Sequence, residues 1–300
     1  MATRDQATDA QHLYDSRASV YDESFHPRFA RHMVHLAKIQ PGEHVLDLAC
    51  GTGLVTFLAS EAVGATGSVV GVDISAGMLA EAEAKKTTTA TRQVGGHVQL
   101  HQHSITSLST LSAVKDKHFD LITCASALVL LEHPAQALRE WTNYLKPCGR
   151  LVVDVTHIQN QTPGVIFERV GRRMRRPLPW YRTNFPDGEA LRRAMRDAGL
   201  KGVEIVLMSQ LEPARGEGET LKDFICDVGQ PRISRVYGIE QADEVFEAQI
   251  GGVAMQGIAS PDEVREEAKR LFREEWANAA DADGKVREVD GVFVGIGFKP

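Results

Sequence analysis

The 300-residue sequence predicts an α/β fold in which helices cover both faces of a mostly parallel sheet. Between residues 44 and 209, short apolar runs alternate with segments of helical periodicity. This alternation is typical of parallel strands joined by right-handed crossovers. Gly51 and Gly53 directly follow the first apolar run, and glycine at both positions allows a tight turn into a helix. A separate apolar run at residues 291–298 predicts a last strand.

The elements follow in a regular order. Phe29, Met33 and Leu36 recur at helical spacing in residues 28–39, before Pro41 ends that helix. The sequence predicts further strands at 44–49, 68–73, 97–103, 119–126, 150–155 and 203–209. It predicts the connecting helices at 53–62, 76–86, 134–145 and 187–198.

Composition excludes several classes of protein. With 43% hydrophobic residues, the chain can bury a full core, as one large domain or as one domain with a lid. A net charge of −6 gives no global basic field that would attract nucleic acid. Cys50, Cys124, Cys148 and Cys226 lack metal-ligand spacing, so we expect free thiols and no metal. No apolar run approaches the roughly 18 residues of a membrane span, and no apolar signal core follows Met1, so we expect a cytoplasmic protein.

The most informative motif is Val-Leu-Asp-Leu-Ala-Cys-Gly-Thr-Gly at residues 45–53. It places Asp47 at the end of a strand, and Asp73 ends the next apolar run, 20 residues after Gly53. A dinucleotide-binding loop would carry a third glycine at Thr56 and would hold pyrophosphate, which a neighbouring carboxylate repels. A carboxylate suits a cofactor with an ammonium and a sulfonium, which indicates S-adenosylmethionine, and Asp73 can accept hydrogen bonds from both ribose hydroxyls.

On these residues the chain resembles the class I S-adenosylmethionine-dependent methyltransferases, of the small-molecule type related to the ubiquinone/menaquinone methyltransferases. The family's first motif, Asp/Glu-x-x-x-Gly-x-Gly, is matched at residues 47–53, and further matches occur at 119–122 and 145–151. The resemblance covers about residues 14–209 and the last strand. It implies a Rossmann-like sheet of seven mostly parallel strands with an antiparallel last strand, and S-adenosylhomocysteine as the product.

We expect three parts in the chain. Residues 1–40 form N-terminal lid helices, and residues 41–209 together with 290–300 form the cofactor-binding core. Residues 210–289 replace a connection that is short in the family, and structureless loops of that length are uncommon. This insertion is expected to be a helical lid that, with residues 157–186, forms the substrate pocket at the carboxyl ends of the strands. Helical periodicity appears in Leu221–Val228, Ala242–Ile250 and Pro261–Ala277.

The resemblance implies which residues hold the cofactor. Asp47 and Asp73 supply the carboxylates, while Ile74 and Met78 pack against adenine. Ser104 stands where the family usually has aspartate, and its hydroxyl can still bond an amino group. The full expected set is Tyr21, Asp47, Ala49, Gly51, Thr52, Gly53, Asp73, Ile74, Met78, Ser104, Ile105 and Ala125.

Methyl transfer mainly needs an acceptor aligned with the methyl group, helped where required by a base, which is most often histidine. His133 and His157 follow the fourth and fifth strands and are the preferred catalytic candidates, ahead of His26. For each histidine, an ordinary surface or helix-start role is an open alternative. Tyr21, and less clearly Tyr14, lies in a stretch that resembles the family's N-terminal lid helix, where a tyrosine points at the methionine carboxylate or the reacting methyl.

Residues 124–131, Cys-Ala-Ser-Ala-Leu-Val-Leu-Leu, lack the Asn/Asp-Pro-Pro-Tyr/Phe clamp for planar amides and favour an apolar substrate wall. We therefore expect a small, partly apolar metabolite as acceptor, methylated on oxygen, sulfur or carbon, as in quinone or natural-product tailoring. One alternative is an RNA or protein methyltransferase that uses the arginine-rich segment 169–182, although nucleic acid fits the acidic chain poorly. Another is a cofactor-binding scaffold that transfers no methyl group. A homodimer is left open.

Overall fold

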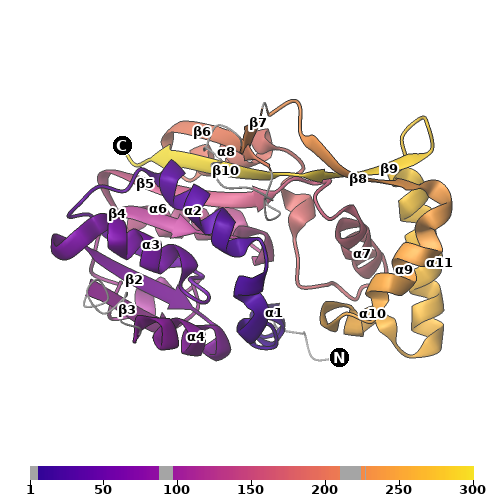
Figure 1. The fold of residues 1–300 in the computed structure, drawn as a ribbon, viewed down its shortest axis with the longest axis horizontal. Coiled ribbons are helices and arrows are strands. Elements are labelled where there is room, and N and C mark those ends of the chain that lie inside the picture. The colour runs from indigo at the N-terminus through magenta and orange to yellow at the C-terminus, as the bar shows by residue number, and fades with distance from the viewer. Residues whose placement is uncertain (1–5, 88–96, 210–223, 227) are drawn as a thin grey trace.

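A central sheet organises the computed structural model, which describes residues 6–87, 97–209, 224–226 and 228–300 (Figure 1). In this part of the chain the sheet has eight strands in the order β3-β2-β1-β4-β5-β10-β6-β7. Strands β1 to β5 pair in parallel, and β10 runs antiparallel between β5 and β6. The strands are β1 His44–Leu48, β2 Ser68–Asp73, β3 Val98–Gln102, β4 Phe119–Cys124, β5 Leu145–Thr156, β6 Lys201–Met208, β7 Ile225–Cys226 and β10 Val292–Phe298.

The predicted α/β class, with its antiparallel last strand, is confirmed. The short strand β7 adds an eighth member at the edge, where Ile225 and Cys226 pair with Met208 and Leu207 of β6. The expected helix at Leu221–Val228 is therefore wrong at these two residues, because the open edge of β6 supplies backbone partners that favour an extended chain. Residues 221–223 and 227 of that prediction lie outside the described residues.

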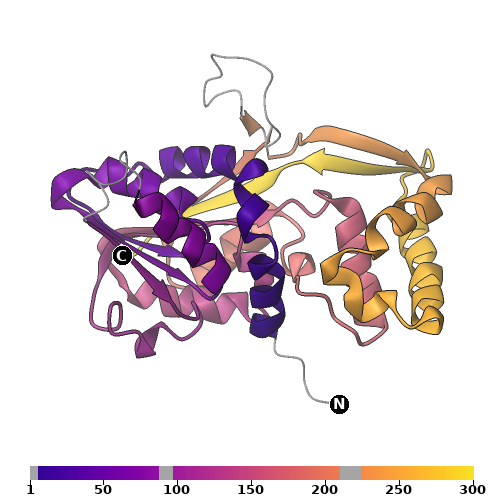
Figure 2. The ribbon, with the colours of Figure 1, turned by 60° about the horizontal axis from the view of Figure 1, so that its bottom comes forward.

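Two layers of helices sandwich the sheet (Figure 2). On one face, Phe29 and Met33 of α2 pack with Val63 of α3 against apolar strand residues. On the other face, Trp141 of α6 and Leu191 of α8 do the same. Each predicted helix of the core is found within about two residues of its expected ends, which is the usual uncertainty of helix boundaries. The helices are α1 Gln6–Asp15, α2 His26–Ala37, α3 Leu54–Val63, α4 Ala76–Lys86, α6 Pro134–Asn143 and α8 Gly188–Asp197.

A second group of helices lies beside the sheet, and we call it the helical module. It combines α7 Thr162–Arg173, α9 Ala242–Ile250, α10 Gln256–Ala259 and α11 Asp262–Ala279 with a two-stranded ribbon, β8 Arg232–Gly238 and β9 Lys285–Asp290. Its core contains Phe167, Phe246, Phe272 and Trp276, so α7 packs with helices about 80 to 110 residues further along the chain. Helices α9 and α11 were expected, whereas the ribbon was not.

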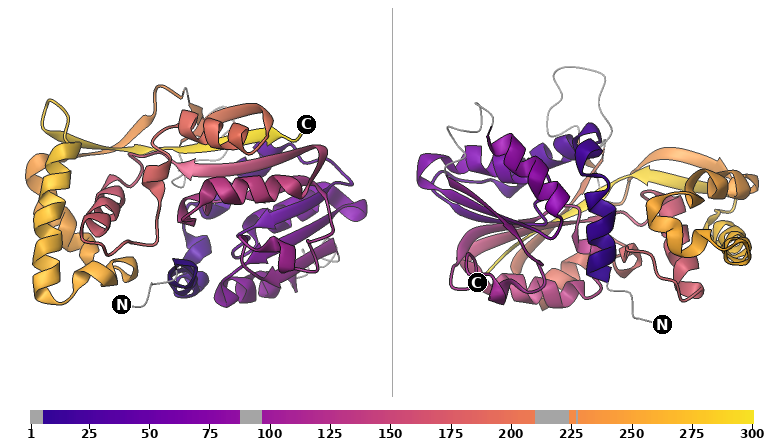
Figure 3. Two further views of the ribbon diagram at one scale, coloured as in Figure 1. Left: turned by 180° about the vertical axis from the view of Figure 1, so that it is seen from behind. Right: turned by 90° about the horizontal axis from the view of Figure 1, so that it is seen from below.

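The carboxyl ends of the parallel strands point toward this module, and α1 lies between the module and the sheet (Figure 3). These strand ends are the region where open α/β sheets bind ligands. In the ranges that the structure describes, no helix is both long and apolar enough to cross a bilayer.

Candidate functional site

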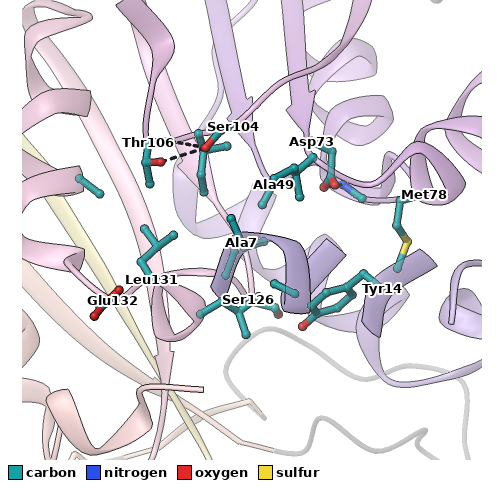
Figure 4. Close-up of a pocket in the computed structure, with 18 of the residues that line it drawn as sticks. Ala7, Tyr14, Ala49, Asp73, Met78, Ser104, Thr106, Ser126, Leu131 and Glu132 are labelled. Carbon is teal, nitrogen blue, oxygen red and sulfur yellow. Dashed lines mark hydrogen bonds between the residues drawn. The ribbon is translucent and has the colours of Figure 1, made fainter. Parts of the chain in front are cut away.

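The main cavity has a volume of about 370 Å³ and opens at the carboxyl ends of β1, β2 and β4 (Figure 4). Helix α1 contributes Ala7, Ala10 and Tyr14 to its wall. This volume is within the range of small-molecule sites in proteins. The wall includes these predicted residues: Tyr21, Ala49, Gly51, Asp73, Ile74, Met78, Ser104, Ile105 and Ala125.

The glycine turn shapes one side of the main cavity. Gly51 and Gly53 have φ angles of 54° and 82°, in the left-handed region that glycine adopts without strain. A Cβ at Gly53 would also lie 2.4 Å from the ring of Phe57. Gly53 precedes α3 and lines neither of the two cavities described here, so it acts through the shape of the turn.

Asp73 joins the end of β2 to the glycine turn. One carboxylate oxygen accepts a hydrogen bond from the Gly51 N–H and the other from the Ser75 N–H, both at 2.8 Å. Burial raises the pKa of Asp73, and these backbone donors oppose the increase. A carboxylate has about four acceptor positions, so Asp73 keeps capacity for hydroxyl donors in the cavity.

Asp47 lies below the main cavity rather than in its wall. The hydroxyls of Thr56 and Thr123 donate to its two oxygens at 2.6 and 2.8 Å. Burial raises the pKa of Asp47 to about 6, although both hydrogen bonds favour the ionised form. Asp47 and Thr52 line a smaller adjoining cavity of about 30 Å³. Thr56, at the position of the missing third glycine, therefore orients this carboxylate.

The N-terminal segment closes over the site through two aspartates. Asp15 accepts hydrogen bonds from the Ser75 hydroxyl at 2.5 Å and from the Gly77 N–H at 3.0 Å, at the start of α4. Asp22, in the short helix η1 (Ala18–Glu23), accepts from the Thr52 hydroxyl at 2.6 Å and forms an ion pair with Lys85. These contacts hold α1 and η1 against the glycine turn.

Tyr21 is the lid residue that lines both cavities. Its ring stacks on the ring of His26, with centroids 3.9 Å apart. Burial lowers the pKa of His26 to about 4, so this imidazole is neutral at physiological pH. Tyr14 also lines the main cavity, and its hydroxyl points toward Ser126 (Figure 4).

Residues 39–176 match the family model described as a methyltransferase domain. The ubiquinone/menaquinone biosynthesis C-methyltransferase UbiE of Ectopseudomonas mendocina is 36% identical over 140 residues, which are 47% of this chain and 52% of that protein. The same enzyme of Pseudomonas aeruginosa (strain LESB58) is 35% identical over 140 residues, with the same shares. Residues 39–176 are thus similar in sequence to methyltransferases. The chain spans about half the length of the curated relatives that it matches.

Solved structures agree with the fold of this methyltransferase domain. A cyclopropane-fatty-acyl-phospholipid synthase-like protein from Lactobacillus casei has a TM-score of 0.53 and 15% identity, with 90% of each chain covered. A methyltransferase-like protein from Bacillus halodurans has a TM-score of 0.51 and 16% identity, with 90% of this chain and 98% of that chain covered. At such identities the similarity concerns the fold alone.

The two histidines expected near the reacting atoms are placed differently. His133, which directly precedes α6 of the methyltransferase domain, lines the main cavity. His157 follows β5 and does not line it: its ring packs 5.2 Å from that of Phe293, and its Nδ1 accepts from the Gln159 N–H at 3.1 Å. Burial lowers the pKa of His157. Of the two, only His133 is in position to reach a ligand in this cavity.

Sequence reasoning missed Asp154, which lies near the carboxyl end of the apolar strand β5. Its Oδ1 accepts a hydrogen bond of 2.6 Å from the N–H of Ser126, which lines both cavities with a φ of 57°. Burial raises the pKa of Asp154 to about 7. The available signal was an acidic residue flanked by Val153 and Val155, because such a residue is rarely buried without a purpose.

The arginine-rich segment is largely occupied by contacts within the protein. Arg173 donates to Glu274 and Glu275 at 2.6 and 2.9 Å, and Arg172 donates to Glu168 at 3.0 Å. Because these guanidinium groups are already paired, the segment offers a weaker polyanion surface than its sequence suggests.

Proposed function

We propose that the protein binds S-adenosylmethionine in the main cavity and transfers its methyl group to a small, partly apolar metabolite. The observation that carries this proposal is Asp73, whose carboxylate is fixed by Gly51 and Ser75 at the cavity wall. Such a carboxylate suits the two ribose hydroxyls. The apolar side chains of Ile74, Met78 and Ile105 suit the adenine ring.

The smaller cavity supports the same assignment. It adjoins the main cavity along Ala49 and Gly51, and Asp47 and Thr52 line it. We propose that the amino-acid end of the cofactor is held on this side, under Tyr21, where the acidic Asp47 favours an ammonium group.

S-adenosylmethionine supplies a methyl group that is already activated by the sulfonium. The remaining task of the protein is alignment and the exclusion of water. Ala127, Leu130 and Leu131 form an apolar part of the wall, which suits a partly apolar acceptor. We propose His133, which lines the cavity, as the base that takes a proton from an acidic acceptor. None of the described residues in 157–186 and 224–289 lines this cavity, and their expected part in selecting the acceptor stays a proposal.

The relatives favour one subset of acceptors. The two bacterial relatives are C-methyltransferases of ubiquinone and menaquinone biosynthesis by name. Their names support an acceptor with a quinone-like ring that is methylated on carbon. Their similarity covers 47% of this chain, and oxygen and sulfur acceptors therefore belong in the test as well.

The test is a transfer assay with S-adenosylmethionine labelled on its methyl group and a panel of phenols, thiols and quinones. We expect label in at least one acceptor, and a lower kcat for His133→Ala with unchanged affinity for S-adenosylhomocysteine. His157→Ala is the matched control and should keep its kcat. Cofactor binding without transfer to any acceptor would favour the scaffold alternative instead.

A further inference from the structure

A buried cation lies behind the wall of the main cavity, outside the residues assigned to the cofactor. Arg182 begins the short helix η6 (Arg182–Asn184) and is only 7% exposed. Its guanidinium lies over the ring of Trp180, 4.6 Å from the centroid, and Nη2 donates to Oε1 of Gln161 at 3.2 Å. Its Nε and Nη1 atoms are buried and have no hydrogen-bond partner among the described residues.

No described carboxylate forms an ion pair with this guanidinium. The nearby acid is Glu168, which is fully buried, but its oxygens accept from the backbone N–H of Arg182 at 3.0 Å and from the Thr183 hydroxyl at 2.7 Å. Arg172 donates to the same carboxylate at 3.0 Å. A buried charge with unused donors destabilises a fold unless a partner is supplied.

A glycine of α7 leaves the space that the buried guanidinium of Arg182 needs. At Gly164 of α7, a Cβ would lie 2.8 Å from Nη1 of Arg182, so the glycine leaves the space that the guanidinium occupies. Burial lowers the pKa of Arg182, and the charge of Glu168 opposes that decrease. Arginine nevertheless stays protonated in proteins, so the group remains a cation at physiological pH.

One backbone hydrogen bond of the neighbouring Tyr181 and one electrostatic effect relate Arg182 to the main cavity. The N–H of Tyr181 donates to the carbonyl of Val129 at 2.6 Å, which fixes the segment to the turn η5 (Leu128–Leu130), whose Leu130 lines the cavity. Tyr14 of α1 also lines the cavity. Burial raises the pKa of Tyr14, and the positive charges of Arg17 and Arg182 oppose the increase. Arg182 itself does not line the cavity, but the segment that carries it is fixed to the part of the wall that η5 forms.

We propose that Arg182 binds an anionic group, a carboxylate, on the methyl acceptor, so that the substrate is an apolar acid. This inference rests on the proposed function, since it assigns the acceptor to the main cavity. The apolar wall contacts the apolar part of the acid, and the unused guanidinium N–H groups donate hydrogen bonds to its carboxylate. Nε and Nη1 are buried and Arg182 does not line the cavity in this structure, so binding of the acid requires a local rearrangement of the wall.

The first test compares acids with neutral molecules of the same shape. Calorimetry on the full chain, saturated with S-adenosylhomocysteine, measures the binding of benzoate, 3-phenylpropanoate and octanoate, each beside its primary amide. We expect at least one acid to bind about tenfold or more tightly than its amide, as hydrogen bonds to a charged group give. Equal affinities in all three pairs, or no binding of any acid at millimolar concentration, would overturn the proposal.

Variants then assign the preference to Arg182. In Arg182→Gln we expect the acid and its amide to bind within about twofold of each other, because the cation is gone. Arg172→Gln removes a neighbouring cation that lies over Tyr181, and it should keep the preference. Gly164→Ala crowds Nη1 with the charge retained, and it should weaken the preference even if Arg182→Gln does not fold.

Retention of the full preference in both Arg182→Gln and Gly164→Ala would contradict the assignment. The affinity for S-adenosylhomocysteine separates this inference from the proposed function. If that ligand binds to the wild-type protein and the acids do not, only the inference about Arg182 fails. If S-adenosylhomocysteine itself does not bind, the proposed function fails.

Discussion

The sheet core and the helical module differ in where they bury charge. In the core, Asp47, Asp73 and Asp154 are nearly inaccessible, and all three lie near the carboxyl ends of strands, at or beside the main cavity. The module is built around aromatic rings of α7, α9 and α11, and it pairs most of its charges at the surface. Its one fully buried acid, Glu168, faces the segment that joins it to the core.

This difference indicates that the buried carboxylates of the core serve ligand binding, whereas the aromatic centre of the module serves stability. Burying three carboxylates destabilises the core and is useful only where a ligand needs them. An aromatic centre with surface ion pairs stabilises the module and does not perform chemistry by itself. Substitutions in the aromatic centre of the module should therefore change stability, and those at the buried carboxylates of the core should change cofactor binding and pH dependence.

The largest effect is expected from Trp276→Ala in α11. The side chain is fully buried against Phe272 and Tyr237, and truncation of such a ring costs about 3–5 kcal/mol of unfolding free energy. Denaturant unfolding measures the loss, with the exposed Val236→Ala as control. Under native conditions the affinity for S-adenosylhomocysteine should stay near that of the wild type. A large decrease in that affinity would contradict the separate roles of the core and the module.

The next effect is a change in pH dependence in Asp154→Asn. Burial raises the pKa of Asp154 from 3.8 to about 7, so the fold favours the protonated acid. The stability that Asp154 contributes is full below about pH 4 and is lost as the pH rises through about 7. Relative to the wild type, the asparagine variant should gain stability between these values, by roughly 4 kcal/mol at most.

Unfolding measured from pH 4 to pH 8 on both proteins gives this difference directly. Asparagine keeps an oxygen that can accept from the Ser126 N–H, so the comparison isolates the charge. A difference that does not vary with pH would show that Asp154 titrates normally.

Asp73→Ala should weaken cofactor binding by about 1–3 kcal/mol, because the ribose hydroxyls lose their acceptor. Asp120→Ala is the matched control: that carboxylate pairs with Lys146 at 2.7 Å near the start of β4, far from the carboxyl ends of the strands. Calorimetry with S-adenosylhomocysteine should find the loss only in Asp73→Ala. Equal affinity in the two variants would exclude the ribose assignment.

The smallest effect is expected from Glu274→Gln, which removes one partner of Arg173 on the module surface. Exposed ion pairs contribute little to stability and are screened by salt. The melting temperature should fall less than in Trp276→Ala, and the decrease should disappear at high salt. A decrease that persists in salt would show that the pair is more than a surface contact.

Local sequence signals were sufficient for elements such as β2 and α4, which have their predicted bounds. The apolar run ends at Asp73, and Ser75 caps the helix by accepting from the Met78 N–H at 3.0 Å. The glycine turn and most residues of the cavity wall lie at the ends of such strands, so the same local signals predict them.

Other features depend on contacts between distant residues. The ribbon pairs residues 232–238 with 285–290, and no local pattern indicates such a pairing. His157 lies outside the cavity wall because its N–H donates to the Gly291 carbonyl at 3.0 Å, which ties the chain to the start of β10. The burial of Arg182 likewise results from packing against Trp180 and Gly164, which a linear arginine-rich segment does not reveal.

The most direct measurement is a calorimetric titration of the full chain with S-adenosylhomocysteine, beside a parallel titration with NAD. We predict one site of micromolar affinity for S-adenosylhomocysteine and no binding of NAD, because the acidic strand ends suit the first ligand and repel the pyrophosphate of the second. Absence of binding to S-adenosylhomocysteine, or binding of NAD in its place, would contradict this prediction.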